Sequence, residues 1–308
     1  MARKPRIQFA NAIYHVINRG NYRHDVFATA GALQIFENCL LEACELAGWL
    51  LHAYVLMSNH FHLAVETPRA NLFQGMHWLE SKFSTRFNRF RGESGHVFQG
   101  RYKSFLVEPG TPLARVVDYI HLNPARAHIV SAQQLPEFRW SSYRRFLGPD
   151  RPAFLICKEW LFQHGLADTS AGWEDYQRHL MQVAGQDPES RTREPFASGW
   201  AIGCDDWRKI IVDDQKTRLA ELALSGARET ELLHLQWKCA LSELLAEAGQ
   251  TEDSARQAPK GAGWKIELAG KLRWSVGATV RWIARELHMG SPNSVRVYLS
   301  RHSKEINK

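Results

Sequence analysis

The sequence predicts an α+β protein in which a βαββαβ domain is followed by an all-helical region. Over about the first 125 residues, short runs of alternating or β-branched apolar residues take turns with longer runs at helical spacing. Beyond Ser141 the apolar residues recur at helical spacing alone. The chain has 308 residues, more than one comfortable hydrophobic core accommodates, so two or three domains are expected.

Local signals place each element of the first domain. Thr29 is a favourable N-cap for the first helix, and only Ser58 and Asn59 separate the second and third strands, which predicts a hairpin. Asn123-Pro124 is expected to end the last helix. Strands are predicted at 12–18, 49–57, 60–66 and 102–107, and helices at 29–48, 72–90 and 113–122.

This element order is the split βαβ arrangement of ferredoxin-like domains. Gly148-Pro149-Asp150 predicts a boundary after it, and the polar stretch 250–263 predicts a linker. The expected domains are therefore a ferredoxin-like domain at 1–147, an acidic helical domain at 148–250, a linker at 251–262 and a helix-turn-helix unit at 263–308.

Charge divides the chain in the same way. The net charge is +7, distributed as +6 over residues 1–150, −5 over 151–262 and +6 over 263–308. Two basic modules around an acidic one suggest that the ends of the chain meet nucleic acid or another anionic surface, although chance clustering of solvated charges would give the same pattern. Five cysteines without metal-type spacing, no apolar leader and no long apolar run predict a cytoplasmic protein in a reducing compartment.

The segment His60-Phe61-His62 is the first candidate for chemistry. Alternation along a strand sends both imidazoles to one face of the sheet and Phe61 to the other. Leu63 and Val65 share the Phe61 side and should pack against a helix, so the histidine face is expected to be open to solvent. Taken alone, paired histidines on a strand are more often surface or hydrogen-bonded residues than metal ligands.

The predicted helix near residue 120 supplies the second candidate. Tyr119 and Asn123 are four residues apart and project from one helix face. If this helix crosses the sheet face that bears His60 and His62, a phenol, an amide oxygen and two imidazoles share one site. Such ligands suit Mg²⁺ or Mn²⁺. In an isolated helix, Tyr119 would instead be a core residue and Asn123 a C-terminal cap.

Three segments together, 14–20, 57–63 and 117–124, resemble the single-tyrosine HUH transposases, in particular the REP-associated tyrosine transposases. The resemblance covers about residues 7–147. It implies a ferredoxin-like domain that uses a divalent metal to cut and rejoin single-stranded DNA at hairpin-flanked sites.

Carried over residue by residue, the resemblance makes His60 and His62 metal ligands, Asn123 the third ligand and Tyr119 the nucleophile. Some relatives have Gln in place of Asn123, and Asn is one methylene shorter.

The implied chemistry agrees with these residue types. A tyrosine with a pKa near 10 is only about 0.1% ionised at pH 7, so it needs a proton acceptor and a phosphate activated by a metal. Attack by Tyr119 would leave a 5′-phosphotyrosine and a free 3′-OH. Because the covalent link keeps the phosphodiester energy, the reverse reaction can join another 3′-OH without ATP.

Basic and polar side chains in both end modules are expected to contact DNA. In the first domain they are Asn18, Arg19, Lys82, Arg86, Arg89, Arg101, Lys103 and Arg126, and in the last unit Asn293, Arg296 and Arg301. A turn at Met289-Gly290 between two helical stretches predicts the helix-turn-helix, whose second helix would enter a duplex DNA groove. A purely structural helical hairpin is the alternative.

Three functions remain open from the sequence. The leading hypothesis is a transposase-like DNA strand transferase that acts on single-stranded and hairpin DNA through Tyr119. The alternative is a non-catalytic DNA-binding regulator that uses its C-terminal helix-turn-helix, and a third hypothesis is an ordinary metal-dependent hydrolase. A homodimer is compatible with all three.

Overall fold

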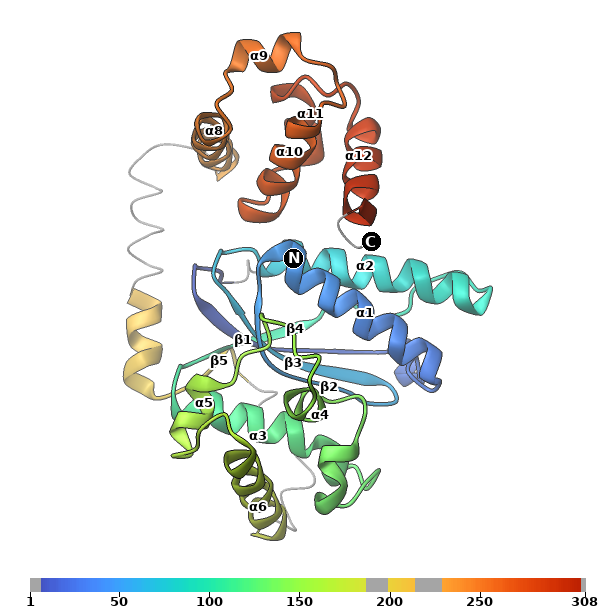
Figure 1. Ribbon diagram of the computed structural model, residues 1–308, viewed down its shortest axis with the longest axis vertical. Coiled ribbons are helices and arrows are strands. Elements are labelled where there is room, and N and C mark those ends of the chain that lie inside the picture. Colours follow the sequence, from blue (N-terminus) through green and yellow to red (C-terminus); the bar gives the residue numbers. More distant parts are fainter. Residues whose placement is uncertain (1–6, 187–198, 214–228, 306–308) are drawn as a thin grey trace. The chain divides into compact units, whose positions relative to one another are not determined.

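The computed structural model describes residues 7–186, 199–213 and 229–305 (Figure 1). The other residues of the four predicted domains lie outside the described part of the chain. The chain forms two compact units. The first contains residues 9–68 and 75–211, and the second contains the helices after residue 228 together with residues 69–74.

The first unit is built on a five-stranded sheet with the order β2-β3-β1-β4-β5 (Figure 1). Its strands are β1 (Ala12–Arg19), β2 (Leu50–Leu56), β3 (His60–Thr67), β4 (Lys103–Val107) and β5 (Ala201–Ile202). The first four are antiparallel to their neighbours, and β5 runs parallel to β4. With helices between β1 and β2 and between β3 and β4, this order confirms the predicted ferredoxin-like α+β fold.

One face of the sheet is covered by α1 (Ala30–Ala47) and α2 (Leu72–Arg91) (Figure 1). The hydroxyl of Thr29 accepts the Ala32 N–H at the start of α1, as expected of an N-cap. Phe61 points to this face, where its ring lies 4.7 Å from that of Phe36 between ring centroids. Phe83 of α2 lies 5.1 Å from Phe36 in the same way, so an aromatic core joins both helices to the sheet.

The opposite face, which bears the histidines, is covered by α3 (Thr111–Arg126). The expectation of a solvent-open histidine face was therefore wrong: His15, His52 and His62 are fully buried. The physical reason is that α3 is apolar along its sheet-facing side and buries that side against the strands.

The third helix also runs past the expected stop at Asn123-Pro124 and ends at Arg126. The Ala127 N–H still donates to the Asn123 carbonyl at 2.9 Å. A proline in the last turn therefore removes one donor without ending the helix.

The helices after residue 141 pack on α3 in the same unit. They are α4 (Ser142–Leu147), α5 (Lys158–Gln163) and α6 (Ser170–Gln186). Trp160 and Tyr176 are fully buried, with ring centroids 5.2 Å apart, and both lie next to His121 of α3. The compact units thus divide near residue 211, not at the expected boundary after residue 147, because these aromatic residues bury their surface against α3 and α4.

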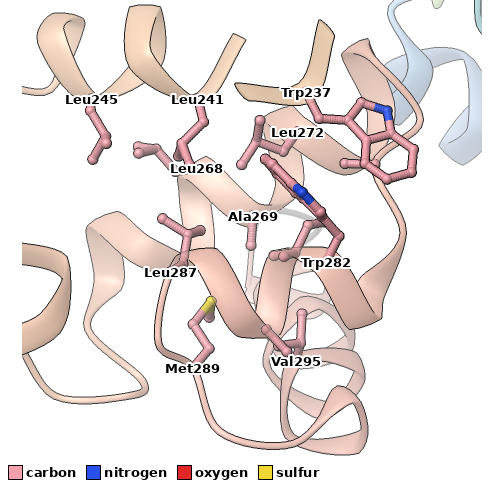
Figure 2. Packing of buried hydrophobic residues seen from close by; sticks show 13 residues of the cluster. Trp237, Leu241, Leu245, Leu268, Ala269, Leu272, Trp282, Leu287, Met289 and Val295 are labelled. Atoms are coloured by element: carbon pink, nitrogen blue, oxygen red, sulfur yellow. The ribbon is translucent and has the colours of Figure 1, made fainter. Parts of the chain in front are cut away.

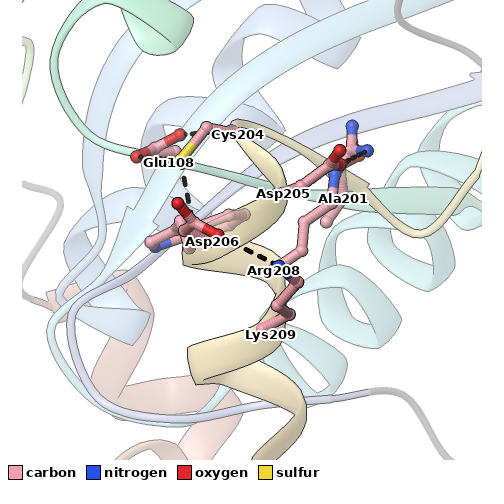
Figure 3. Close-up of polar contacts among 8 residues, drawn as sticks. Glu108, Ala201, Cys204, Asp205, Asp206, Arg208 and Lys209 are labelled. Atoms are coloured by element: carbon pink, nitrogen blue, oxygen red, sulfur yellow. Dashed lines mark hydrogen bonds and ion pairs between the residues drawn. The ribbon is translucent and has the colours of Figure 1, made fainter.

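The edge of the sheet beyond β4 is covered by residues 199–213. The Leu106 N–H donates to the Trp200 carbonyl at 3.0 Å, and the Glu108 N–H donates to the Ile202 carbonyl at 2.8 Å. The Glu108 carboxylate accepts the Cys204 N–H at 2.7 Å, at the start of the helical residues 205–213 (Figure 3). This segment therefore pairs with β4, whose backbone groups would otherwise form an open edge.

The second unit is all α-helical. Its helices are α8 (Glu229–Glu247), α9 (Glu252–Gln257), α10 (Gly263–Ser275), α11 (Val280–Glu286) and α12 (Pro292–Glu305). Its core is drawn from α8, α10, α11 and α12, and includes Trp237, Leu272, Trp282 and Val295 (Figure 2). The expected linker contains α9, because Thr251 caps that helix through the Ser254 N–H. The predicted pair of helices joined near Gly290 is present as α11 and α12.

Within the described residues, no helix combines the length and apolar character that a bilayer crossing requires.

Candidate active site

Tyr119, His62 and His15 come together from three different elements. The ring centroid of Tyr119, on α3, lies 5.4 Å from that of His62 on β3 and 6.0 Å from that of His15 on β1, both edge-on. Strand pairing explains the two imidazoles, because His15 and His62 project from the same face of neighbouring strands. The sequence predicts that Tyr119 and His62 share a site if α3 crosses this face, and α3 does so. Their catalytic roles remain a prediction.

The two ring nitrogens of His62 have different surroundings. Its Nδ1 lies 3.0 Å from Nε2 of His15, and the two rings are stacked with centroids 5.2 Å apart. Its Nε2 is buried and has no hydrogen-bond partner among the described residues. If Nδ1 of His62 donates to His15, Nε2 carries the lone pair that a metal ligand needs.

The sequence did not predict that His15 lies beside His62 in this site. It belongs to the segment 14–20, but its position gives no sign of a partner 47 residues away.

His60 lies beside His62 on the same strand face, with ring centroids 5.1 Å apart. Its Nδ1 lies 2.7 Å from Oδ1 of Asn59. An amide oxygen accepts hydrogen bonds, so Nδ1 carries the proton and Nε2 carries the lone pair. Asn59 thereby fixes the ring and its tautomer in the manner of a residue that supports a metal ligand.

Both imidazoles are neutral at pH 7. Burial lowers the pKa of His60 to about 4, and the nearby Arg19 guanidinium adds to this effect. Burial also lowers the pKa of His62 well below its ordinary value, with smaller contributions from His15 and His60. A neutral imidazole is the form that binds a metal ion, so neither ligand has to lose a proton first.

Asn123 and Arg126 follow Tyr119 on α3. Asn123 is buried one turn after the tyrosine, with its Nδ2 donating to the Tyr119 carbonyl at 3.4 Å. The Arg126 guanidinium lies over the Tyr119 ring at 5.3 Å from its centroid. A cation is thus held next to the phenol, where it can attract a phosphate.

These residues fit a divalent cation. The two imidazoles are neutral, and the buried Nε2 of His62 lacks a hydrogen-bond partner among the described residues. Asn123, on the same helix as Tyr119, carries an amide oxygen, which is a further possible ligand. Nitrogen and oxygen donors of this kind suit Mg²⁺ or Mn²⁺ with open positions for phosphate oxygens.

Most of the residues that the sequence assigns to DNA contact have exposed or half-exposed side chains. These are Arg19, Lys82, Arg89, Arg101, Lys103, Arg126, Asn293, Arg296 and Arg301. Arg19 pairs with His60 across β1 and β3, and Lys103 pairs with Ile17, whose other partner is His62. Two cations therefore flank the histidines on their own sheet face.

Asn18 and Arg86 are instead engaged within the protein. Asn18 is buried on the opposite face of the sheet, and its Nδ2 donates to Oε1 of Glu80 at 2.6 Å. Arg86 makes two contacts with the Glu42 carboxylate, at 2.5 and 3.1 Å. The strand alternation that sends Arg19 toward the site sends Asn18 away from it.

The loop after β1 presents an aromatic side chain that the sequence did not single out. Tyr22 is 82% exposed and has a φ of 51°, and the next residue, Arg23, has a φ of 61°. Both adopt the left-handed region that non-glycine residues seldom occupy. Tyr22 borders a cavity of about 670 Å³ that is also lined by His24, Arg91 and His96.

The buried histidines predict a strong loss of stability in acid. Burial holds the folded-state pKa of His60 near 4 and that of His121 near 3, and lowers that of His62, whereas an exposed histidine titrates near 6.5. As the pH falls from about 6.5 to 4, the unfolded chain takes up protons that the folded chain does not. Each such group removes up to about 1.4 kcal/mol of stability per pH unit.

His179 acts in the opposite direction, because its hydrogen bond to Asp118 raises its pKa. Its stabilisation is present below about pH 6.5 and is lost as the pH rises through the folded-state pKa. Urea unfolding of the metal-free protein between pH 7.5 and 5 should still show a net fall. A free energy of unfolding that is flat over this range would contradict buried neutral imidazoles.

The first unit thus combines a ferredoxin-like fold with a tyrosine and two imidazoles that meet on one face of its sheet. Residues 8–123 match the family model described as IS200-like transposase. No curated protein matches the chain.

Two solved structures are similar to parts of the chain. A REP-associated tyrosine transposase bound to a REP hairpin is 15% identical, with a TM-score of 0.41, over 51% of this chain and 92% of that one. A Deinococcus radiodurans R1 protein described as a candidate transposase is 20% identical, with a TM-score of 0.29, over 44% of this chain and 96% of that one.

Proposed function

We propose that this protein is a metal-dependent strand transferase that cuts and rejoins single-stranded or hairpin DNA through a 5′-phosphotyrosine on Tyr119. The observation that carries the proposal is the meeting of the Tyr119 ring with His62 and His15 under the Arg126 guanidinium. Tyr119 thus contacts two imidazoles and a cation on the sheet face that bears the histidines. The motifs at 57–63 and 117–124 support the same reading.

His60, His62 and Asn123 would hold the divalent cation, which when bound makes the scissile phosphate more reactive toward attack. Arg126, Arg19 and Lys103 would neutralise and orient the phosphate. The Tyr119 oxygen would form a bond to phosphorus, its proton would be lost to solvent or a nearby base, and the bond from phosphorus to the 3′ oxygen would break. A free 3′-OH and a 5′-phosphotyrosine result, and attack by another 3′-OH reverses the step.

The activity can be tested with a labelled single-stranded hairpin and Mn²⁺. Strand transfer predicts a protein–DNA adduct that survives denaturation, together with a free 3′-OH product. Cleavage without any adduct would point to an ordinary hydrolase. Absence of both, across several hairpins and metals, would favour a DNA-binding regulator.

The exposed loop residue Tyr22 is expected to stack on an unpaired base. Stacking of this kind contributes about 1–3 kcal/mol per base, so Tyr22→Ala should weaken hairpin binding by about 10-fold to 100-fold. Phe162 is a matched control, because it is 76% exposed on α5, away from the loop after β1. Equal affinities of Tyr22→Ala and Phe162→Ala in a fluorescence anisotropy titration would remove Tyr22 from the DNA interface.

A duplex-binding role for the second unit is favoured by the exposed face of α12. Asn293, Arg296 and Arg301 all lie on solvent-exposed positions of this helix, after the turn at Gly290. We infer that this face binds duplex DNA as the second helix of a helix-turn-helix.

In the full chain, changing both Arg296 and Arg301 to Ala should weaken duplex binding by about 10-fold or more and reduce its salt dependence. Hairpin adduct formation should be unchanged. Arg256→Ala on α9 is the control, since this arginine is exposed in the same unit. Unchanged duplex binding in the double variant would leave α11 and α12 as a structural hairpin.

A further inference from the structure

A second group of metal-ligand side chains lies on the side of α3 that faces α5 and α6. Asp118, next to Tyr119 in the chain, contacts two histidines. Its Oδ1 lies 3.2 Å from Nε2 of His164, which caps the end of α5, and its Oδ2 lies 2.9 Å from Nε2 of His179 on α6. The ligand atoms of all three residues lie within 4.8 Å of one another. Three separate segments therefore converge on one point.

Hydrogen bonds account for only part of this cluster. Nε2 of His164 is buried and makes no aligned hydrogen bond with any described residue, although the Asp118 oxygen is near. The two imidazole rings approach to 4.4 Å between centroids. A cation between the rings would use both nitrogens and the carboxylate.

Asp118 accepts a hydrogen bond of the kind that holds a metal-binding carboxylate in place. The Tyr176 hydroxyl donates to Oδ1 of Asp118 at 2.9 Å, and Nδ1 of His121 lies 2.9 Å from that hydroxyl. Outer hydrogen bonds of this kind hold a metal ligand in place. The His179 side chain is 32% exposed, whereas those of His164 and Asp118 are 14% and 10% exposed, so an ion can enter from the side of His179.

We propose that Asp118, His164 and His179 form a binding site for Zn²⁺, separate from the cluster on the sheet face. Two imidazole nitrogens and one carboxylate oxygen are a common zinc ligand set, with a fourth position left for water. Bond lengths of about 2.0–2.1 Å in a tetrahedral site place the ligand atoms about 3.3 Å apart, close to the 3.2 and 2.9 Å between the Asp118 carboxylate oxygens and the two imidazole nitrogens. The bound ion joins α3, which bears Tyr119, to α5 and α6.

The test uses the full-length chain and removes the other cluster first. A protein with His60→Gln and His62→Gln should still bind one Zn²⁺ in calorimetry, and Co²⁺ should give the visible spectrum of a tetrahedral site. Adding His164→Gln and His179→Gln to it should weaken binding at least about 100-fold, because two of three ligands are lost. His96→Gln, at an exposed histidine, is the matched control and should change nothing.

Zinc X-ray absorption of the His60→Gln, His62→Gln protein gives a second measurement that does not depend on folding of the larger variant. Two imidazoles and oxygen ligands are expected. No ion bound to that protein, or an ion with fewer than two imidazoles, overturns the proposal and leaves the cluster as a hydrogen-bonded ion pair. Because the other cluster is absent from this protein, the result stands whether or not Tyr119 cleaves DNA.

Discussion

Replacing Tyr119 with Phe is expected to abolish the covalent protein–DNA adduct while leaving hairpin binding nearly intact. The phenyl ring can keep its edge-on contacts with His62 and His15 and its place under Arg126, so only the phenolic oxygen, the proposed nucleophile, is lost. Loss of a nucleophile typically lowers turnover by roughly 10³-fold or more. The readout is the adduct band from a labelled hairpin with Mn²⁺ under denaturing conditions, compared with hairpin affinity under native conditions.

Tyr143→Phe is the matched control for this experiment. Tyr143 is a buried tyrosine of the same unit, and its ring stacks on His121 on the α5 and α6 side of α3. This variant should form the adduct at the wild-type rate. An adduct that persists in Tyr119→Phe would assign the nucleophile to another residue, whereas loss in both variants would indicate damage to α3 and its packing.

The strands β1 to β4 and the helices α1 to α3 could be predicted from the sequence because alternation, helical spacing and capping residues are local signals. The alternation that defines β3 also places His60 and His62 on one face, and the four-residue spacing on α3 places Tyr119 and Asn123 together. The burial of the histidine face could not be predicted in this way. It depends on α3, which lies more than 40 residues further along the chain.

The remaining features of the site depend on contacts between distant segments. His15 stacks on His62 because β1 pairs with β3 in one particular register, in which Ile17 lies opposite His62. Neither residue type nor spacing encodes that register for a reader of the sequence alone. His164 and His179 lie 15 residues apart, and only the packing of α5 and α6 against α3 brings both to Asp118. The boundary near residue 211 has the same origin, since buried aromatic residues and not punctuation residues hold α5 and α6 on the sheet domain.

The second large effect is expected from His60→Ala, which should reduce Mn²⁺-dependent adduct formation at least about 100-fold. Residues that only support a ligand cost 10–100-fold in metal affinity when changed, so loss of a ligand should reach at least the upper end of that range. His60 is preferable to His62 for this test because it is partly exposed and its ring is held by Asn59 at the edge of the cluster. The protein should therefore fold without it. Raising the Mn²⁺ concentration should restore part of the rate.

His52→Gln separates a metal role from general damage to the histidine face. His52 is fully buried on β2, and its Nε2 contacts Glu66 at 3.2 Å. Its loss should lower the melting temperature more than loss of His60, yet leave the dependence of adduct formation on Mn²⁺ unchanged. His60→Ala should therefore change the Mn²⁺ dependence of adduct formation more, and His52→Gln should lower the melting temperature more. If His60→Ala keeps the wild-type Mn²⁺ dependence, the paired imidazoles do not bind the catalytic ion, and Tyr119 would have to act with Arg126 and the flanking cations alone.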